Sequence, residues 1–581
     1  MNDFLTSVNA ILWHESVLFM LLGTGVVFTL WSGFCQYRSL THGVHVTRGV
    51  YDHPDDPGAI NHFQALSAAL SATVGLGNIG GVALAISLGG PGAIFWMWVV
   101  GFFGMAVKLT EVILSMLYRN TDDPDNPHGG PMWVISKAMR RRSPALGKVG
   151  RGIGVVFCVT LLISTATGGN MFQAWNVGII TQEYFGVPSI ATGIVLAILV
   201  GMVIIGGIKR IGAVTGRLVP IMLALYLLAG IYVLIVNFRT IPEIFALIFS
   251  AAFSPLEASG AFLGGTMGYA FLFGMKRALF SNEAGQGTSP IAHSAAKTNE
   301  PVREGIVAGL EPFIDTIVVC TLTALVILST GVWNRAPEAE LVQAPELVQL
   351  ADGGWSLEPV VAPARTGSAW EVGDRVFVVL SAHANPQSGN NLHRLHGTIV
   401  EGHPLEENGA EDRGGRLQIE WDVINSDTVP RLAGNNIFVS YVGATLTAKA
   451  FDTAIPGLGK WLVTMAVWMF ALSTLISWSY YGEQGVVFLA GDRAVLPYKI
   501  IFCSLTIVAT MGFFETDAQL DNLTGMGTGV MLFVNVPIMW LLGRQAMRAY
   551  KDYFRRFESG QMGPEHPPPS IEDLISGRDV E

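Results

Sequence analysis

A run of glycines inside one apolar segment could supply backbone groups that bind a small charged solute. In the segment 65–92, Val74-Gly-Leu-Gly-Asn-Ile-Gly-Gly81 interrupts a stretch that is long enough to cross a membrane. Unpaired N–H and C=O groups cost several kcal/mol in hydrocarbon, so a helix broken at this depth is expected to line a cavity or bind a ligand. Close packing of two helices against small residues would explain the same glycines.

The broken helix predicts where a carboxylate would bind. The N–H groups of Leu76, Gly77 and Asn78 would face it, assisted by the positive N-terminal end of the half-helix that follows. Secondary transporters use discontinuous helices of this kind at their binding sites.

Polar residues also interrupt the apolar segment 152–182. Asn170 and Gln173 lie there beside Phe172, and an amide in a membrane helix needs a ligand or another helix as its partner. These three residues are therefore candidate pocket residues. Trp478 and Phe172 could bound the side-chain end of the pocket, although an aromatic ring in a membrane helix commonly serves packing alone.

Composition indicates that these residues belong to a polytopic membrane protein and not to a soluble domain. Of the 581 residues, 50% are hydrophobic and only 14% are charged, and the mean hydropathy is +0.45. Lys and Arg occur in short clusters beside the apolar runs, so no footprint for nucleic acid is present. We expect the four cysteines to be buried and free, because they are far apart and lack metal-ligand spacing: Cys35, Cys158, Cys320 and Cys503.

Apolar runs of about 18 residues or more predict eleven membrane helices. They lie near 17–35, 65–88, 93–117, 152–182, 188–207, 212–237, 259–275, 305–330, 461–482, 497–514 and 524–543. Lys and Arg collect in every second loop, which predicts an outer N-terminus and a cytoplasmic C-terminus in the inner membrane of a bacterium. The tail beyond Phe557 is expected to be disordered.

One long loop departs from this pattern. Residues 331–443 hold no possible span and contain short alternating runs such as Arg375–Leu380 and Leu417–Asp422, separated by Gly, Asn and Pro. The loop is expected to be a small β-rich domain outside the cell. It could be an insertion without a role in transport, or it could take part in gating or partner binding.

Several charged residues fall inside predicted spans and need partners. Lys108 and Glu111 lie three residues apart on one helix and are expected to neutralise one another. Glu311 and Asp315 lie one turn apart, and at least one of them is expected to be protonated or bound to a cation. Glu283 is expected in a cytoplasmic loop, either solvated or part of an inner gate.

Six stretches of the membrane part resemble the alanine/glycine:cation symporter family. They are Phe63–Gly81 (FQALSAALSATVGLGNIGG), Gly89–Trp98 (GGPGAIFWMW), Gly168–Gln173 (GGNMFQ), Phe280–His293 (FSNEAGQGTSPIAH), Asp315–Leu325 (DTIVVCTLTAL) and Ser477–Glu483 (SWSYYGE). The resemblance implies sodium- or proton-coupled uptake of alanine or glycine on the LeuT-type fold, with two inverted five-helix repeats that begin at the second span. The long loop is not part of the resemblance.

The resemblance divides the chain and implies an ion site. The divisions are an extra N-terminal helix (1–36), the transporter core (61–330 and 444–545), the β-rich insertion (331–443) and a cytoplasmic tail (546–581). A sodium ion would lie between the broken helix and the ninth span. Its ligands would be hard oxygen atoms from Ser71, Val74, Phe470, Ser473 and Thr474.

The inverted repeat also implies a second broken helix, expected at Ser259–Gly268 in the seventh span, with close helix packing as the rival explanation of its glycines. The expected substrate pocket combines both breaks. Besides the residues named above, it would contain Thr73, Gly75, Gly264, Gly265 and Thr266.

Two other classes of protein fit the sequence less well. A channel would need a ring of charges or carbonyls repeated by symmetry, which eleven unlike helices do not provide. An enzyme would need a metal or nucleophile motif, and His14-Glu15 does not continue into H-E-x-x-H. We therefore expect no enzymatic activity, and as partners only a small amino acid, sodium and the lipid bilayer. A symporter of another small solute on the same fold stays open.

Overall fold

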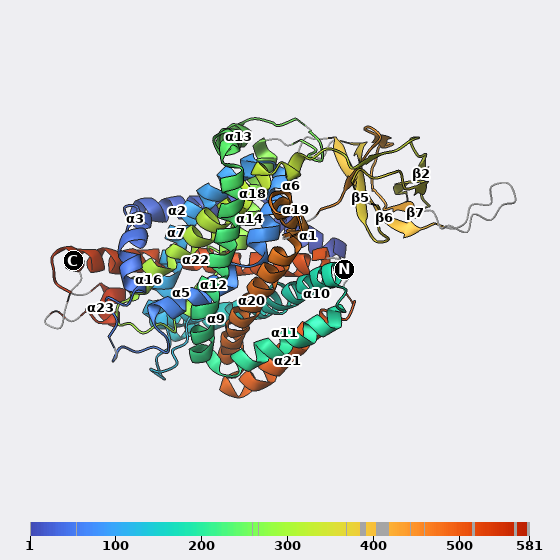
Figure 1. Cartoon of the computed structure of the whole chain (residues 1–581). Helices are drawn as coiled ribbons and strands as arrows, with labels where there is room; N and C mark the ends of the chain where they lie inside the picture. Colours follow the sequence, from blue (N-terminus) through green and yellow to red (C-terminus); the bar gives the residue numbers. More distant parts are fainter. Residues whose placement is uncertain are drawn as a thin grey trace, which may run out of the picture.

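The chain is described here from a computed structural model. It describes residues 2–53, 55–257, 259–264, 267–351, 353–367, 369–383, 391–402, 417–441, 443–457, 459–513, 517–562, 566 and 568–577. A bundle of long helices forms most of the molecule, and short strands form a separate lobe on one side of it (Figure 1).

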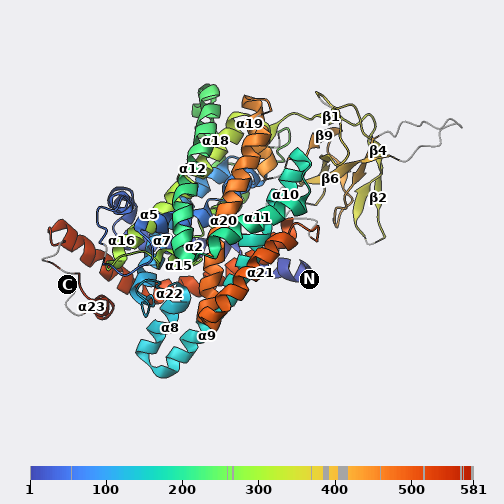
Figure 2. The ribbon, with the colours of Figure 1, turned by 60° about the horizontal axis from the view of Figure 1, so that its bottom comes forward.

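The helices of the bundle are α1 Asn2–Leu12, α2 Glu15–Trp31, α3 Cys35–Arg38, α4 Val44–Thr47, α5 His62–Thr73, α6 Val82–Gly89, α7 Gly92–Tyr118, α8 Pro131–Arg142, α9 Pro144–Ala166, α10 Phe172–Phe185, α11 Ser189–Ile204, α12 Gly207–Val236, α13 Ile241–Phe253, α14 Met267–Asn282, α15 Ser289–His293, α16 Pro301–Ala308, α17 Leu310–Pro312, α18 Thr321–Ser329, α19 Ala444–Ala454, α20 Gly459–Ala490, α21 Val495–Val508, α22 Asp517–Glu558 and α23 Ile571–Ser576. The named strands of the described chain all lie between two helices of the bundle, α18 and α19. The long helix α22 crosses the whole bundle, and α8 and α9 form a hairpin at the end away from the strands (Figure 2).

Seven helical segments of the described chain are long and apolar enough to cross a membrane, and the bent pair of α5 with the helix that follows makes eight. Three more predicted spans coincide with shorter helices, namely α11 and α14 with 16 residues each and α21 with 14. The protein is thus a helical polytopic membrane protein. The number of eleven spans stays a prediction.

The helix break predicted near Val74 is present. Asn61 caps the start of α5 through a capping box with Gln64, and α5 ends at Thr73. A π-helical turn, Gly77–Gly81, then leads into α6, and the two halves are bent by 53°. Three more π-helical turns are present in the described chain, at Ser39–Gly43, Thr167–Met171 and Phe313–Cys320. Turns of this kind occur frequently at functional sites.

The second break lies about one helix length later than predicted. Residues 259–264 lie in a loop before α14, and Gly265 and Thr266 are outside the described residues. The chain leaves the helix after Asn282, and the next helix starts at Ser289. The physical reason is local: Glu283, Gly285 and Gly287 have φ of 54°, 85° and 80°, and left-handed backbone cannot continue an α-helix.

The strands of the described chain lie between Ala339 and Val439. They are β1 Ala339–Glu340, β2 Leu347–Gln349, β3 Trp355–Leu357, β4 Val360–Val361, β5 Arg375–Ser381, β6 Leu392–Glu401, β7 Leu417–Trp421, β8 Arg431–Leu432 and β9 Asn436–Val439. The main sheet has the order β1-β9-β5-β6-β7-β4, with β8 paired to β5, and all its pairs are antiparallel. Alternate side chains such as Val376, Val378 and Leu380 are buried in its core.

The lobe touches the bundle next to both broken helices. Arg394 of β6 donates from Nη2 to the carbonyl of Ala261 (3.0 Å), in the loop before α14, and to that of Ser87 (3.4 Å) in α6. Phe377 and Phe438 pack with Ala261 in a small cluster. The lobe therefore contacts α6, which follows the first break, and the loop that leads into α14.

The C-terminal region contains more structure than predicted. Helix α22 continues to Glu558, and Ile571–Ser576 forms the short helix α23. Leu574 is buried, and Glu572 forms an ion pair with Arg141 of α8. The expectation of disorder beyond Phe557 was wrong for these residues, because α23 has an apolar side that packs against the bundle.

Candidate functional site

The first break presents backbone N–H groups for which the described residues provide no acceptor. Gly75 donates its N–H to Asn78 Oδ1 (2.8 Å), and Asn78 donates its own N–H to the carbonyl of Gly75 (3.1 Å). Among the described residues no acceptor faces the N–H groups of Leu76 and Gly77, which start the π-helical turn. Helix starts with unpaired N–H groups are favourable sites for a carboxylate.

The second break brings a carboxylate and an amide to the same place. Glu283 is 5% exposed and accepts a hydrogen bond from Thr288 Oγ1 (2.5 Å). Gln286 donates from Nε2 to the carbonyl of Leu279 (3.0 Å), while its Oε1 is buried without a partner among the described residues. Glu283 is thus not solvated, and the break supplies acceptor oxygens where the first break supplies donors.

Both breaks line one small cavity of about 40 Å³. Its walls come from α5, the two breaks, α10, α14, α20, α22 and the π-helical turn before α10. The lining residues are Ala72, Thr73, Gly75, Leu76, Gly77, Gly168, Gln173, Phe280, Glu283, Gln286, Thr474, Trp478, Thr524 and Thr528. A cavity of this size admits only a few water-sized groups beyond the surface of its walls, so it suits a small solute.

Three buried oxygen atoms in this lining have no hydrogen-bond partner among the described residues. They belong to Gln173 (Oε1), Gln286 (Oε1) and Thr474 (Oγ1). Buried polar atoms without partners are costly, and here they converge on a cavity. An ammonium group and a cation are the ligands that acceptors of this kind would satisfy.

Six of the predicted pocket residues line the cavity: Thr73, Gly75, Leu76, Gly77, Gln173 and Trp478. Trp478 fits because Gly169 has no side chain, since a Cβ there would lie 2.5 Å from the indole. The prediction missed Glu283 and Gln286. The pair of glycines between Asn282 and Pro290 was the sequence signal that could have found them.

The other predicted pocket residues have partners within the protein or lie elsewhere. Asn170 donates from Nδ2 to the carbonyl of Phe502 (2.7 Å) and accepts from Thr506 (2.9 Å), so it joins two helices. Phe172 and Gly264 are not part of the lining. Gly265 and Thr266 lie outside the described residues.

Asn78 is buried behind the cavity and belongs to a polar group around Asp315. Its Nδ2 donates to Asp315 Oδ1 (2.5 Å), and Ser281 and Thr316 donate to Asp315 Oδ2 at 2.7 and 2.8 Å. Three donors therefore hold the Asp315 carboxyl. This group connects the first break to α14 and to the π-helical turn Phe313–Cys320.

The charged residues pair differently from the prediction. Lys108 Nζ lies 3.3 Å from Glu311 Oε2 and 4.0 Å from Glu111 Oε1, so its nearest partner is on another helix. Glu311 also contacts His293 Nε2 at 2.7 Å. The predicted pair of Lys108 with Glu111 is present, and the nearer partner Glu311 was not predicted, because the sequence does not show which side chains of other helices face Lys108.

The five predicted sodium ligands lie where α5 and α20 cross. Ser71 donates from Oγ to the carbonyl of Ser473 (2.7 Å), and Ser473 donates to the carbonyls of Phe470 (2.8 Å) and Ser71 (3.3 Å). The hydroxyl of Thr474 has no hydrogen-bond partner in the part of the chain that the structure describes, and it faces Gly75, where a Cβ would lie 2.9 Å from it. Carbonyl and hydroxyl oxygens are the ligands that sodium prefers, so this donor set fits the ion.

Replacing Thr474 by alanine is expected to raise the half-saturating sodium concentration about tenfold, because about 1.4 kcal/mol is lost with one ligand. Ser473→Ala should have a smaller effect, since the Ser473 hydroxyl is bonded to two carbonyls. Sodium titration of ligand binding measures both. Thr464→Ala is the matched control, because Thr464 is another buried unpartnered threonine of α20 outside the cavity. Equal effects of Thr474→Ala and Thr464→Ala would remove Thr474 from the ion site.

The bundle with its two broken helices and shared cavity defines a polytopic membrane transporter. Residues 1–358 and 432–566 match the profile of the sodium:alanine symporter family. The chain belongs to this family. The described residues of the unmatched segment 359–431 belong to the strand lobe.

Relatives along nearly the whole chain support this assignment. The sodium/alanine symporter AgcS of Methanococcus maripaludis is 34% identical over 540 residues, which is 93% of this chain and 94% of that protein. The amino-acid carrier protein AlsT of Bacillus subtilis is 34% identical over 560 residues, 96% of this chain and 93% of that protein. A solved manganese transporter of Eremococcus coleocola overlaps 90% of this chain and 94% of its own, with 12% identity and a TM-score of 0.46.

Proposed function

We propose that the protein imports alanine or glycine together with sodium. The observation that carries the proposal is one small cavity between the two breaks, with N–H groups on one side and oxygen atoms on the other that have no hydrogen-bond partner among the described residues. A zwitterionic amino acid needs both kinds of partner when it leaves water. Membership in the sodium:alanine symporter family supports the same substrate class.

Each end of the substrate has a partner of opposite character in the proposed complex. The carboxylate is bound by the N–H groups of Leu76 and Gly77 at the first break. The ammonium group is bound by Gln286 and Gln173, close to the carboxylate of Glu283. Trp478 closes the side-chain end, so residues larger than alanine are excluded by its indole ring.

The proposed transport cycle is alternating access on a LeuT-type core with eleven spans and two inverted repeats. Two broken helices in one binding site are typical of such repeats. Sodium binds between α5 and α20, directly behind the first break, so that the ion fixes the shape of the break and favours substrate binding. The coupling follows from this contact, because each ligand then stabilises the conformation that binds the other.

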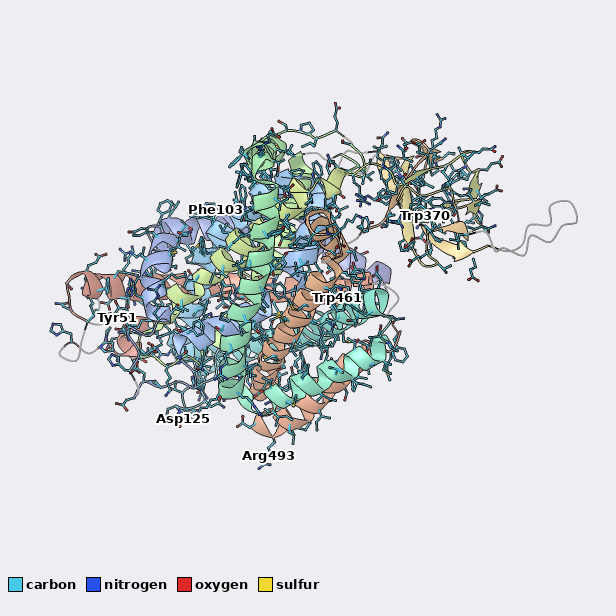
Figure 3. The ribbon with its side chains drawn as sticks, in the orientation of Figure 1. Tyr51, Phe103, Asp125, Trp370, Trp461 and Arg493 are labelled. Atoms are coloured by element: carbon cyan, nitrogen blue, oxygen red, sulfur yellow. The ribbon has the colours of Figure 1, made fainter. Side chains whose placement is uncertain are left out.

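The proposed orientation has the N-terminus outside and the C-terminus in the cytoplasm of a bacterial cell. In support of it, Asp125 and Arg493, which lie in predicted cytoplasmic loops, are at the opposite end of the molecule from Trp370 of the strand lobe (Figure 3). Basic loops remain on the cytoplasmic side of inner-membrane proteins. The lobe is then extracytoplasmic.

Alanine is expected to raise the melting temperature of the purified protein in sodium and to leave it unchanged in potassium. Binding at about 100 times the dissociation constant adds about 2.7 kcal/mol to the folded state. A panel of amino acids separates the proposed substrate from other small solutes: glycine should act like alanine, and leucine and glutamine should not. Stabilisation by a sugar or nucleobase and not by alanine would assign another substrate.

A further inference from the structure

Five buried side chains form a connected group of charges outside the cavity, and we call them the His–Glu cluster. They come from five different helices: His62 of α5, Lys108 of α7, His293 of α15, Glu304 of α16 and Glu311 of α17. Each is at most 1% exposed. None of the five belongs to the lining of the cavity.

His293 lies at the centre of the cluster. Its Nδ1 lies 2.5 Å from Glu304 Oε1, and its Nε2 lies 2.7 Å from Glu311 Oε1. The other oxygen of Glu304 contacts Nδ1 of His62, and Lys108 Nζ lies 3.3 Å from the other oxygen of Glu311. A continuous series of contacts therefore joins His62 to Lys108.

The contacts of His293 determine its protonation. A carboxylate oxygen accepts hydrogen bonds, and a neutral imidazole has only one N–H to donate. With a neutral ring, either Glu304 or Glu311 would face a lone pair at hydrogen-bond distance. With both carboxyls ionised, only the imidazolium form donates to both, so His293 carries two ring protons in this arrangement.

Charge balance leads to the same conclusion. Glu111, whose Oε1 is 4.0 Å from Lys108 Nζ, adds a third carboxylate to Glu304 and Glu311, while Lys108 is the one permanent cation among these buried side chains. A neutral His293 would leave more carboxylates than cations among these side chains, which is very costly in a buried site. Protonation of His293 reduces this excess.

Other charged and titratable groups face the cluster from the surrounding elements. They are Asp52, 3.8 Å from His62 Nε2, and Arg119 at the end of α7, Glu283 at the second break, Asp315 of the π-helical turn Phe313–Cys320 and Tyr481 of α20. The described residues contain no group of His, Cys, Asp and Glu side chains that could hold a metal ion. A histidine ring can bind and release a proton, so His293 is the candidate proton site of the cluster.

The cluster fastens together one half of each broken helix. Helix α5 leads into the first break and α15 follows the second, and the segments beyond them pair as well, since Lys297 donates its N–H to the carbonyl of Ile60 (2.8 Å). In the proposed orientation both halves lie on the cytoplasmic side of the cavity. The cavity can open to that side only if these halves separate, and separation exposes His293 and Glu304 to water.

We propose that the His–Glu cluster is a proton-binding site that holds the cytoplasmic side of the cavity shut. While α5 and α15 are together, His293 keeps its second proton between Glu304 and Glu311. When they separate, an N–H bond of His293 breaks, the proton passes to water, and both carboxylates are hydrated. This inference rests on the proposed function, because it adds a proton step to that transport cycle.

The sign of the pH effect follows from this linkage. A histidine in water is mostly neutral above about pH 7, so the open form loses a proton that the closed form keeps. One linked proton changes an equilibrium by up to about tenfold per pH unit. An acidic cytoplasm therefore holds the cavity shut, and an alkaline one favours opening.

A cysteine at the cavity wall reports opening directly. Thr528→Cys is made in a Cys503→Ser background, because Cys503 is the one native thiol of the described chain that is not fully buried. An impermeant thiol reagent is added from the cytoplasmic side at about pH 6 and about pH 8. The labelling rate is compared with that of the same protein carrying His293→Gln, because the ratio of the two rates cancels the intrinsic pH dependence of the thiol.

The thiol at position 528 is expected to react about tenfold faster in the protein carrying His293→Gln than in its parent at the lower pH. At the higher pH the two rates should be nearly the same. Glu304→Gln is the second variant, and it should reduce the pH dependence as well. His42→Gln is the matched control, because burial lowers the pKa of His42 to about 4 and this ring outside the cluster stays neutral over the range. A ratio that is the same at both pH values for both cluster variants would overturn the proposal.

Sodium-driven alanine uptake by the unmodified chain is measured in parallel. Its absence would contradict the proposed function, while the labelling ratios would still decide whether the cluster binds a proton that is linked to opening. The two failures are therefore distinguishable.

Discussion

Gly77→Val is expected to abolish alanine uptake while the protein still folds. A Cβ at position 77 would lie 3.4 Å from the ring of Phe280, which is an ordinary contact, so the backbone tolerates a side chain. The branched carbons of valine would enter a cavity of only about 40 Å³, in front of the N–H groups proposed to bind the carboxylate. The loss should therefore fall on binding and not on stability.

Two melting temperatures separate these effects. Without ligand, the variant should melt close to the parent, and alanine in sodium should no longer stabilise it by the about 2.7 kcal/mol expected of a saturating ligand. Gly152→Val is the matched control, since a Cβ at Gly152 of α9 meets nothing within 4 Å. A Gly77→Val protein that melts much earlier but still responds to alanine would mean that Gly77 serves helix packing.

Lys108→Met is expected to destabilise the protein by about 3–5 kcal/mol, because it leaves buried carboxylates without their cation. Lys108 is fully buried between Glu311 and Glu111. Thermal unfolding in detergent measures the loss. The double variant Lys108→Met/Glu311→Gln should recover part of it, since it removes one unpaired charge.

Lys499→Met is the control for this prediction. Lys499 Nζ lies 2.9 Å from Glu483, but the two side chains keep 8% and 13% of their surface exposed, so water can solvate the remaining charge. Its effect should be clearly smaller. If Lys108→Met were as mild as Lys499→Met, the buried charges around Lys108 would not be held as described.

The position of the first helix break could be predicted from the sequence, and the position of the second could not. Glycines in an apolar segment are sufficient to indicate that a helix ends, as at Gly75 and Gly77. In the second half of the protein, two glycine-rich stretches compete, and periodicity does not distinguish a loop before a helix from a break within it. The positive φ of Glu283 shows that the helix ends there, and this backbone angle cannot be read from the sequence.

The sequence also does not show which side chains of different helices are hydrogen-bond or ion-pair partners. Asn170 is a polar residue in an apolar segment and was therefore predicted to line the pocket, yet Phe502 and Thr506 of α21 form hydrogen bonds with its amide. Lys108 has Glu111 three residues away, yet Glu311 is closer. In both cases the deciding contact joins residues more than 200 positions apart, and only the packing of the bundle reveals it.

The central claim is that sodium drives alanine through the cavity between the two breaks, and uptake into proteoliposomes tests it most directly. Labelled alanine should accumulate above equilibrium when an inward sodium gradient is imposed, and should only equilibrate slowly when potassium replaces sodium. Thr474→Ala should shift the sodium dependence of this accumulation. Equal accumulation in sodium and in potassium would contradict sodium coupling and with it the assignment of the site behind the first break.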